Sequence, residues 1–287
     1  MANVTLSKES LTFLKEAVSY MESPSLFMQF ANKLGQPIEY LINLPPIPDN
    51  IKNGIHDLAK SALLTGMNFA SNTIWQSPTN LANIEQTISS SNWTGFWHSL
   101  ATSVSGGVSG IFGFSSIAVE LPITTTIIFR SITAISQEFG NDISNPANQM
   151  ECLSIFMHGG KSSKDDSMES AFLSSRLAIK SIIQETSKFV AEQSTKSFSE
   201  ALAKGTAPFL VNYLNMIAQQ FGASVSQKFL AQSIPIISIT TGAAINAAFT
   251  DHFNKVAKYH FGLKKLEKEY GLQYINDEYI KQTRLLN

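Results

Sequence analysis

The sequence predicts an all-α fold, a single multi-helix bundle with glycine-rich, closely packed central helices. Apolar residues recur at helical spacing along most of the chain. One β-branched run, 234–239, could form a strand, but a single run without partners does not make a sheet. Glycines three or four residues apart between Gly106 and Gly113 allow two helices to approach closely. We therefore expect one helical domain over residues 1–287.

The composition narrows the class of protein. Hydrophobic residues make up 44% of the 287 residues and charged residues only 15%, against about 25% charged in ordinary soluble domains. A surface rich in Ser, Thr, Asn and Gln often faces a partner, a lipid surface or a second copy. The net charge of −1 provides no basic stripe, so we expect no nucleic-acid partner. The single cysteine, Cys152, excludes an intramolecular disulfide and fits a reducing compartment.

In the first half of the chain, capping residues, glycine and proline mark the predicted helix ends. Ser7 is suited to cap a first helix over 7–20, because its hydroxyl can accept from a free backbone amide. Asp49 or Asn50 can cap a long helix whose apolar face continues to Ala70. Pro122 is expected to break the next helical region, because it lacks an amide hydrogen. Other helices are expected over 26–42, from residue 92, and over 127–140.

In the second half, an exposed loop near 159–170 separates two helical halves, because Gly, Ser, Lys and Asp dominate it and no apolar periodicity survives. The residues after Asp251 are dense in charge, which predicts a solvated helix face and a polar end. The helices expected on either side of the loop are 151–157, 171–203, 209–221, 225–231 and 242–270.

Three uncharged stretches, 86–119, 205–227 and 229–250, approach the roughly 20 apolar residues of a membrane span. Each contains prolines, amides or many Ser and Gly residues, so we read them as buried core helices, with membrane insertion as the alternative. The N-terminus has no basic segment followed by an apolar run, so no signal peptide is expected. These observations predict a cytoplasmic protein.

Two ionisable residues stand out because each lies in an otherwise uncharged stretch. Burying Glu120 or Arg130 alone would be expensive, so we expect them to pair across a bend at Pro122. The functional alternative is a polar site that receives a lipid headgroup or a partner. Asn246 lies inside an apolar run in the same way, and a buried amide that caps a helix end is the simpler reading. Glu120, Arg130 and Asn246, with Gly106 and Gly110, form the predicted ligand- or partner-binding set.

No catalytic, cofactor or metal site is predicted. The histidines form no H-x-x-x-H pair with a nearby Glu, as a helical zinc site would need. His252 and His260 are eight residues apart, about 12 Å along a helix axis at 1.5 Å per residue, which favours a surface or packing role. Cys152 has apolar neighbours, which predicts a buried and inert thiol.

Two segments carry a resemblance to a known family. The first contains Glu120-Leu121-Pro122, Arg130-Ser131-Ile132 and Glu138-Phe139-Gly140. The second contains Ile234-Pro235-Ile236, then Thr241-Gly242-Ala243-Ala244-Ile245-Asn246, Phe249 and Ala257. Together they resemble the EcsC family, over roughly residues 27 to 270, and Leu44-Pro45 before an amphipathic helix fits as well. The sequence departs from the family where Val119-Glu120 replaces Ala-Asp and where Ser238-Ile239 replaces Gly-Ala.

The resemblance implies a bacterial protein that acts with an ABC transporter ATPase and permease, and it supplies no catalytic residues. The first hypothesis is a non-enzymatic accessory protein at the cytoplasmic face of the membrane. The alternatives are a protein that binds a lipid or another hydrophobic ligand, and a hydrolase with dispersed residues. A deep apolar cavity would favour ligand binding, whereas a filled core with an exposed apolar patch would favour docking to a partner or membrane.

Overall fold

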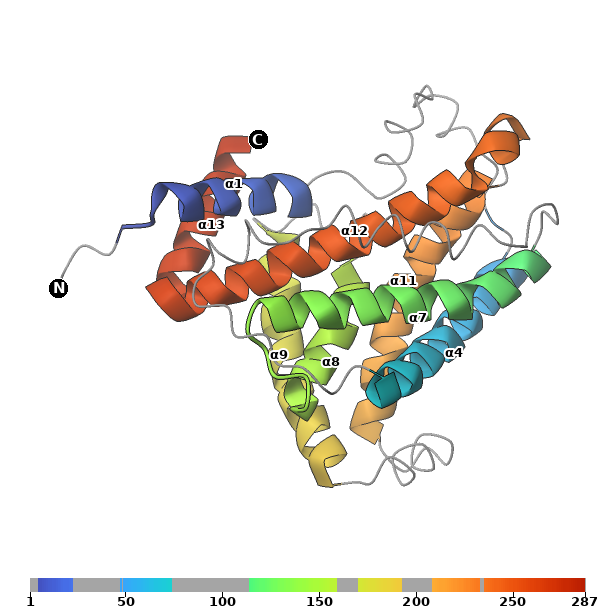
Figure 1. Ribbon diagram of the computed structural model, residues 1–287, viewed down its shortest axis with the longest axis horizontal. Coiled ribbons are helices and arrows are strands. Elements are labelled where there is room, and N and C mark those ends of the chain that lie inside the picture. The colour runs from blue at the N-terminus through green and yellow to red at the C-terminus, as the bar shows by residue number, and fades with distance from the viewer. Residues whose placement is uncertain are drawn as a thin grey trace.

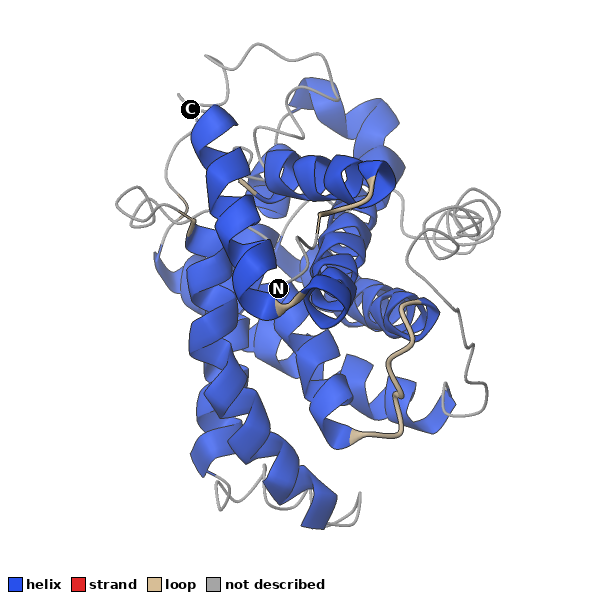
Figure 2. Cartoon of the chain, turned by 90° about the vertical axis from the view of Figure 1, so that its left-hand side faces the viewer, coloured by secondary structure: helices blue, strands red, loops and turns tan. Residues whose placement is uncertain are grey.

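The computed structural model describes residues 5–22, 47, 49–73, 114–158, 170–192, 208–232 and 235–286. Within these ranges the regular structure is helical and contains no strand, which confirms the all-α prediction (Figure 2). The elements are α1 (Lys8–Met21), α4 (Asp49–Thr73), α7 (Phe114–Glu138), α8 (Pro146–Ser154), the 3-10 helix η1 (Ile155–His158), α9 (Ala171–Glu192), α11 (Pro208–Gln232), α12 (Pro235–Tyr270) and α13 (Leu272–Leu286).

The longest helix, α12, is the element on which most others pack (Figure 1). α7, α11 and η1 contact it on one side, and α1 and α13 contact it toward its C-terminal end. α4 packs extensively on α7 and on α11, while α8 packs on α9. Residues from both halves of the sequence therefore share one hydrophobic core.

Several helix ends form as their cap residues predict. The Ser7 hydroxyl accepts a hydrogen bond of 3.1 Å from the Ser10 amide at the start of α1. Asn145 caps α8 through a bond of 2.9 Å from the Ala147 amide, and Pro146 occupies the first turn, where its missing N–H costs nothing. Gly140 ends α7 with a φ of 80°, a left-handed conformation that favours glycine.

Aromatic side chains fill the junction of η1, α11 and α12. Phe156, Phe221, Phe249 and Phe253 are fully buried. Their ring centroids lie 4.7 Å apart for Phe156 and Phe221, and 5.1 Å apart for Phe156 and Phe253 and for Phe249 and Phe253. Tilted and edge-on pairs of this kind suit the ring quadrupole. The interior at this junction is therefore packed with rings.

Glycines permit close helix approach at two positions of the described helices. Gly106 and Gly110 lie outside the described residues, as does most of the predicted loop at 159–170. Gly66 of α4 faces the backbone of α7 at Thr125 and Thr126, where a Cβ atom would lie 3.5 Å away. Gly222 of α11 faces the backbone of His56 on α4 at 3.6 Å. The backbone of α4 thus lies close to α7 at Gly66 and close to α11 at Gly222, because neither glycine has a side chain.

Three predictions of helix breaks were wrong. α7 continues through Pro122, and α11 continues through residues 222–224, where two helices were expected. α12 begins at Pro235 rather than at residue 242, so residues 235–239 of the β-branched run are helical. In α7 and α11, burial overrides local preference. Leu121, Thr124 and Thr125 are buried around Pro122, and the loss of one hydrogen bond is outweighed by packing.

The C-terminal segment is also more buried than its charge density predicted. Phe253, Val256, Ala257 and Phe261 lie in the core because α12 is covered on several sides. His252 and His260 are buried with them, at 6% and 4% exposure, which confirms a packing role rather than a surface one. Among the described helices, none combines the length and the apolar character that crossing a bilayer requires.

The contact of α1 with α12 yields a first prediction. An added Cβ at Gly262 of α12 would overlap the ring of Phe13, which is 2% exposed. We expect Gly262→Ala to lower the free energy of unfolding by about 1–3 kcal/mol, because overpacking a filled core forces neighbours to move. Urea unfolding followed by circular dichroism measures this change.

Gly66→Ala is the matched control for Gly262→Ala. It also replaces a helical glycine, but its Cβ would make only ordinary contacts at 3.5 Å. We expect it to be neutral or to stabilise the protein by up to about 1 kcal/mol, because alanine restricts the unfolded chain. Equal effects of the two substitutions would contradict the close contact of α1 with α12.

Candidate functional site

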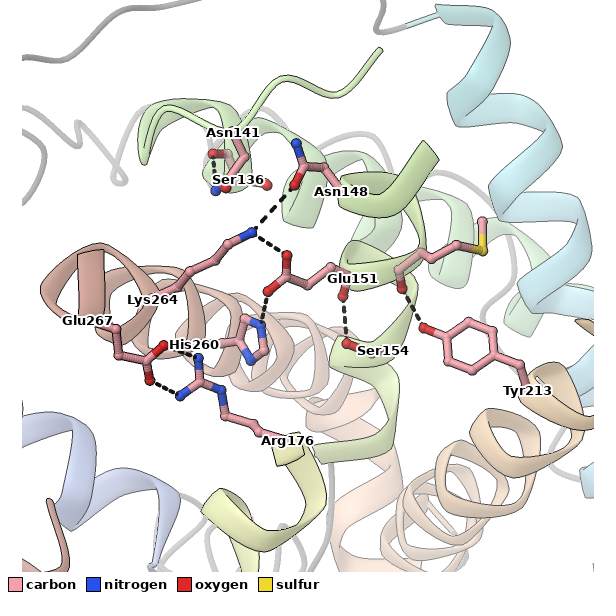
Figure 3. A network of polar contacts seen from close by, with 11 residues as sticks. Ser136, Asn141, Asn148, Glu151, Ser154, Arg176, Tyr213, His260, Lys264 and Glu267 are labelled. Carbon is pink, nitrogen blue, oxygen red and sulfur yellow. Dashed lines mark hydrogen bonds and ion pairs between the residues drawn. The ribbon is translucent and has the colours of Figure 1, made fainter. Parts of the chain in front are cut away.

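A buried polar network joins α8, η1, α9 and α12, and Glu151 of α8 lies at its centre (Figure 3). One carboxylate oxygen, Oε1, lies 3.0 Å from Nε2 of His260, and the other, Oε2, accepts from Nζ of Lys264. His260 and Lys264 are one turn apart on α12. The Lys264 ammonium also reaches Oδ1 of Asn148 at 3.4 Å.

The network fixes the charge of Glu151. Burial would raise the pKa of this carboxyl, but the hydrogen bond from His260 and the ammonium of Lys264 outweigh burial and lower the pKa to about 2. The carboxylate is therefore ionised at neutral pH. A carboxylate only accepts hydrogen bonds, so Nε2 of His260 carries the proton in this contact.

A bidentate ion pair forms the second part of the network. Nη1 of Arg176 on α9 lies 2.6 Å from Oε1 of Glu267 on α12, and Nη2 lies 3.3 Å from Oε2. Both side chains are nearly buried, at 12% and 13% exposure. The guanidinium also lies 5.5 Å from the centre of the Phe172 ring. This geometry, in which two N–H groups meet one carboxylate, is strong and directional.

His158 extends the network into η1. Its Nδ1 lies 3.2 Å from the hydroxyl of Ser175, and that hydroxyl donates to the backbone oxygen of Phe172 at 2.8 Å. The ring centroids of His158 and His260 lie 5.8 Å apart. Because the Ser175 proton goes to a carbonyl, the serine is not activated as a nucleophile by His158. These contacts favour a structural role for the pair.

A second polar cluster contains the residue that the sequence singled out first. Nζ of Lys228 on α11 contacts Oε1 of Glu120 on α7, and the lysine side chain is only 3% exposed while that of Glu120 is 20% exposed. The ammonium also lies 5.1 Å from the centre of the Phe249 ring on α12. Burial lowers the pKa of Lys228, and the Glu120 carboxylate opposes that shift.

The predicted pairing of Glu120 with Arg130 was wrong. α7 continues through Pro122, so the two residues lie ten positions apart on one helix, about 15 Å along its axis. Arg130 is exposed. Asn246 of α12 lies one turn before Phe249, and its Oδ1 is a buried atom that meets no hydrogen-bond donor among the described residues. Of the predicted residues, Glu120 therefore contacts Lys228 directly, whereas Asn246 is near this cluster only through its place one turn from Phe249.

Sequence reasoning missed Lys228, although a signal was present. It is the only charged residue between Lys204 and Asp251, the same criterion that selected Glu120 and Arg130. The network around Glu151 had no such signal, because 109 positions separate Glu151 from His260.

Cys152 is buried as predicted, and burial raises the pKa of its thiol to about 12. Within the described helices, no three His, Cys, Asp or Glu side chains are grouped to hold a metal ion.

The exposure difference in the Glu120–Lys228 pair yields a second prediction. Glu120→Gln leaves a buried ammonium without its counter-charge, so we expect a loss of about 3–5 kcal/mol in the free energy of unfolding. Lys228→Met should cost less, because Glu120 retains some access to water. The double variant should recover part of the loss. Chemical unfolding at pH 7 measures all three.

Arg130→Ala is the control for this pair. Because Arg130 is exposed, we expect a change below about 1 kcal/mol, as for surface contacts in general. A loss at Arg130 as large as that at Glu120 would revive the original pairing and contradict the one described.

Comparison with protein families gives one match. The model of the EcsC protein family matches residues 11–266. No curated protein matches the chain, and no solved structure matches it. The matched region includes the Glu120–Lys228 pair and the Glu151 network up to His260 and Lys264 of α12, and it ends one residue before Glu267. The chain belongs to the EcsC family.

Proposed function

We propose that the chain is a non-enzymatic interaction protein that acts with an ABC transporter at the cytoplasmic face of the membrane. The transporter context comes from the family resemblance. The observation that supports a non-enzymatic role is the way the buried charges are used. Glu151, Lys228 and Arg176 each meet an opposite charge on another helix, so these groups hold helices together rather than facing a substrate.

The filled aromatic core supports docking through the outer surface. Phe156, Phe221, Phe249 and Phe253 occupy the junction at which a ligand cavity between helices would otherwise open. Large apolar side chains are exposed on three different helices, namely Ile123 at 55%, Leu177 at 55% and Phe209 at 62%. A membrane protein partner would cover side chains of this kind.

A lipid headgroup site is the second candidate. The observations that favour it are three buried polar groups that meet no partner among the described residues, namely Oδ1 of Asn246 and the hydroxyls of Thr124 and Thr125. Asn246 lies one turn of α12 before Phe249, the ring that the Lys228 ammonium contacts. A phosphate with hydroxyl groups would offer acceptors to Lys228 and donors to Asn246. It would have to displace the Glu120 carboxylate from Lys228.

Native mass spectrometry separates the two functions. The full chain is purified alone. It is also purified after co-expression with an ABC transporter ATPase and permease from the same organism. We expect a lipid-free mass for the chain alone and a complex of fixed stoichiometry with the transporter. Two results together would contradict the proposed function: no complex forms with the transporter, and the chain purified alone carries a fixed number of lipids. They would favour the lipid-binding function instead.

Surface variants refine this experiment. Ile123→Ser, Leu177→Ser and Phe209→Ser each remove one exposed apolar side chain, and Lys52→Ser on α4 is the polar control. We expect at least one apolar variant to weaken the complex tenfold or more with an unchanged melting temperature. Wild-type binding by all three would exclude docking through these positions.

A further inference from the structure

The two histidines in the Glu151 network have fixed proton positions. Nε2 of His260 donates to the Glu151 carboxylate, which leaves Nδ1 as the nitrogen with a lone pair. The Ser175 hydroxyl gives its proton to the Phe172 carbonyl, so it accepts from Nδ1 of His158 and leaves Nε2 with the lone pair. Both assignments describe the neutral imidazole, in which one ring nitrogen carries the proton and the other carries the lone pair.

The nitrogens that remain are buried without acceptors. Nε2 of His158 and Nδ1 of His260 are inaccessible to solvent and have no hydrogen-bond partner among the described residues. A lone pair in such a position is tolerated at modest cost. A proton on either atom would create a buried N–H group with positive charge and no acceptor, which is far more costly.

The neighbouring charges increase that cost. Arg176 of α9 disfavours the charged form of both imidazoles, and Lys264 of α12 disfavours that of His260. Glu151 of α8 is the only carboxylate among the groups that set the pKa of His260, and both its oxygens are already engaged. Burial is the largest cause and lowers the pKa of each histidine below its usual 6.5.

The remaining ionisable groups around the pair do not offer a second counter-charge. Glu267 of α12 is held by both arms of Arg176. Tyr213 of α11 donates to the Met150 carbonyl at 2.5 Å, and Tyr279 of α13 donates to Glu22 at 3.1 Å. Burial raises the pKa of both tyrosines, so they stay neutral.

We propose that His158 and His260 form a proton-operated switch that loosens α9 from α8 and α11, on which it packs, and from the imidazole rings of η1 and α12 when the pH falls. Phe172 of α9 packs edge-on against both rings, with centroid distances of 5.0 and 6.3 Å. Protonation favours any state in which the rings reach water. The first such state is separation of α9, because α9 carries Phe172, Ser175 and Arg176, which hold the pair from one side.

The sign follows from proton linkage. The open state binds protons with a pKa near 6.5, and the closed state binds them only at lower pH. The closed arrangement is thus fully stable above about pH 6.5 and loses stability as the pH falls below that value. Between pH 7.5 and 5.5, each histidine multiplies the opening constant by at most about 10, and the two together by at most about 100.

Amide hydrogen exchange of the full chain at pH 7.5 and 5.5 tests the switch, after correction for the intrinsic exchange rate. We expect protection in α9 to fall by a factor between about 10 and about 100 in the wild type. The variant His158→Asn with His260→Gln keeps a neutral N–H donor toward Ser175 and Glu151, and its protection in α9 should change less than about threefold. His56→Asn, at a half-exposed histidine of α4, should behave as the wild type.

Two results would overturn the switch. One is an equal loss of protection in the double variant and the wild type. The other requires no substitution: a titration of the wild-type imidazoles by NMR in which His158 or His260 protonates at or above pH 6.5 without opening of α9. The NMR titration decides the question even if the double variant does not fold.

Discussion

The ionised carboxylate of Glu151 is the group on which the C-terminal half of this fold depends. A buried negative charge must be balanced nearby, because the protein interior solvates it poorly. Two side chains of α12, His260 and Lys264, provide that balance across a distance of more than a hundred residues in sequence. Their positions one turn apart fix both the rotation of α12 and its register against α8. His260 in turn meets His158, and Arg176 with Glu267 attaches α9 to the same face of α12.

α12 also explains how two polar clusters coexist with a filled core. Its N-terminal part approaches the Glu120–Lys228 pair through Phe249, and its C-terminal part carries the partners of Glu151. Aromatic rings occupy the space between the two clusters. The paired charges contribute less to the free energy of folding than the aromatic rings do. However, only one packing of the helices places every buried charge beside an opposite charge. The rings therefore supply the driving force for packing, and the charges select its geometry. A protein built in this way uses its polar groups internally, which is consistent with an interaction role through the outer surface.

Local signals in the sequence were sufficient for the helical class, for the cap at Ser7 and for the burial of Cys152. They failed where packing competes with local preference. Pro122 reads as a break, yet the buried residues around it keep α7 continuous. The same limit applies to the site. Glu120 was found because a lone charge in an apolar stretch needs a partner, but its partner Lys228 is on another helix, and spacing along the chain favoured Arg130. Glu151, His260 and Lys264 look like ordinary surface residues in a polar segment. Only the crossing of α8 over α12 brings them together.

A double-mutant cycle between Glu151 and Lys264 tests the central role of this carboxylate most directly. Glu151→Gln, Lys264→Met and the double variant are compared with the wild type by urea unfolding at pH 7. If Glu151 balances its charge against Lys264, the two losses are coupled by about 1–3 kcal/mol, and the double variant is more stable than the sum of the single changes predicts. Additivity within about 0.5 kcal/mol would show that the two side chains act independently, and it would contradict the account.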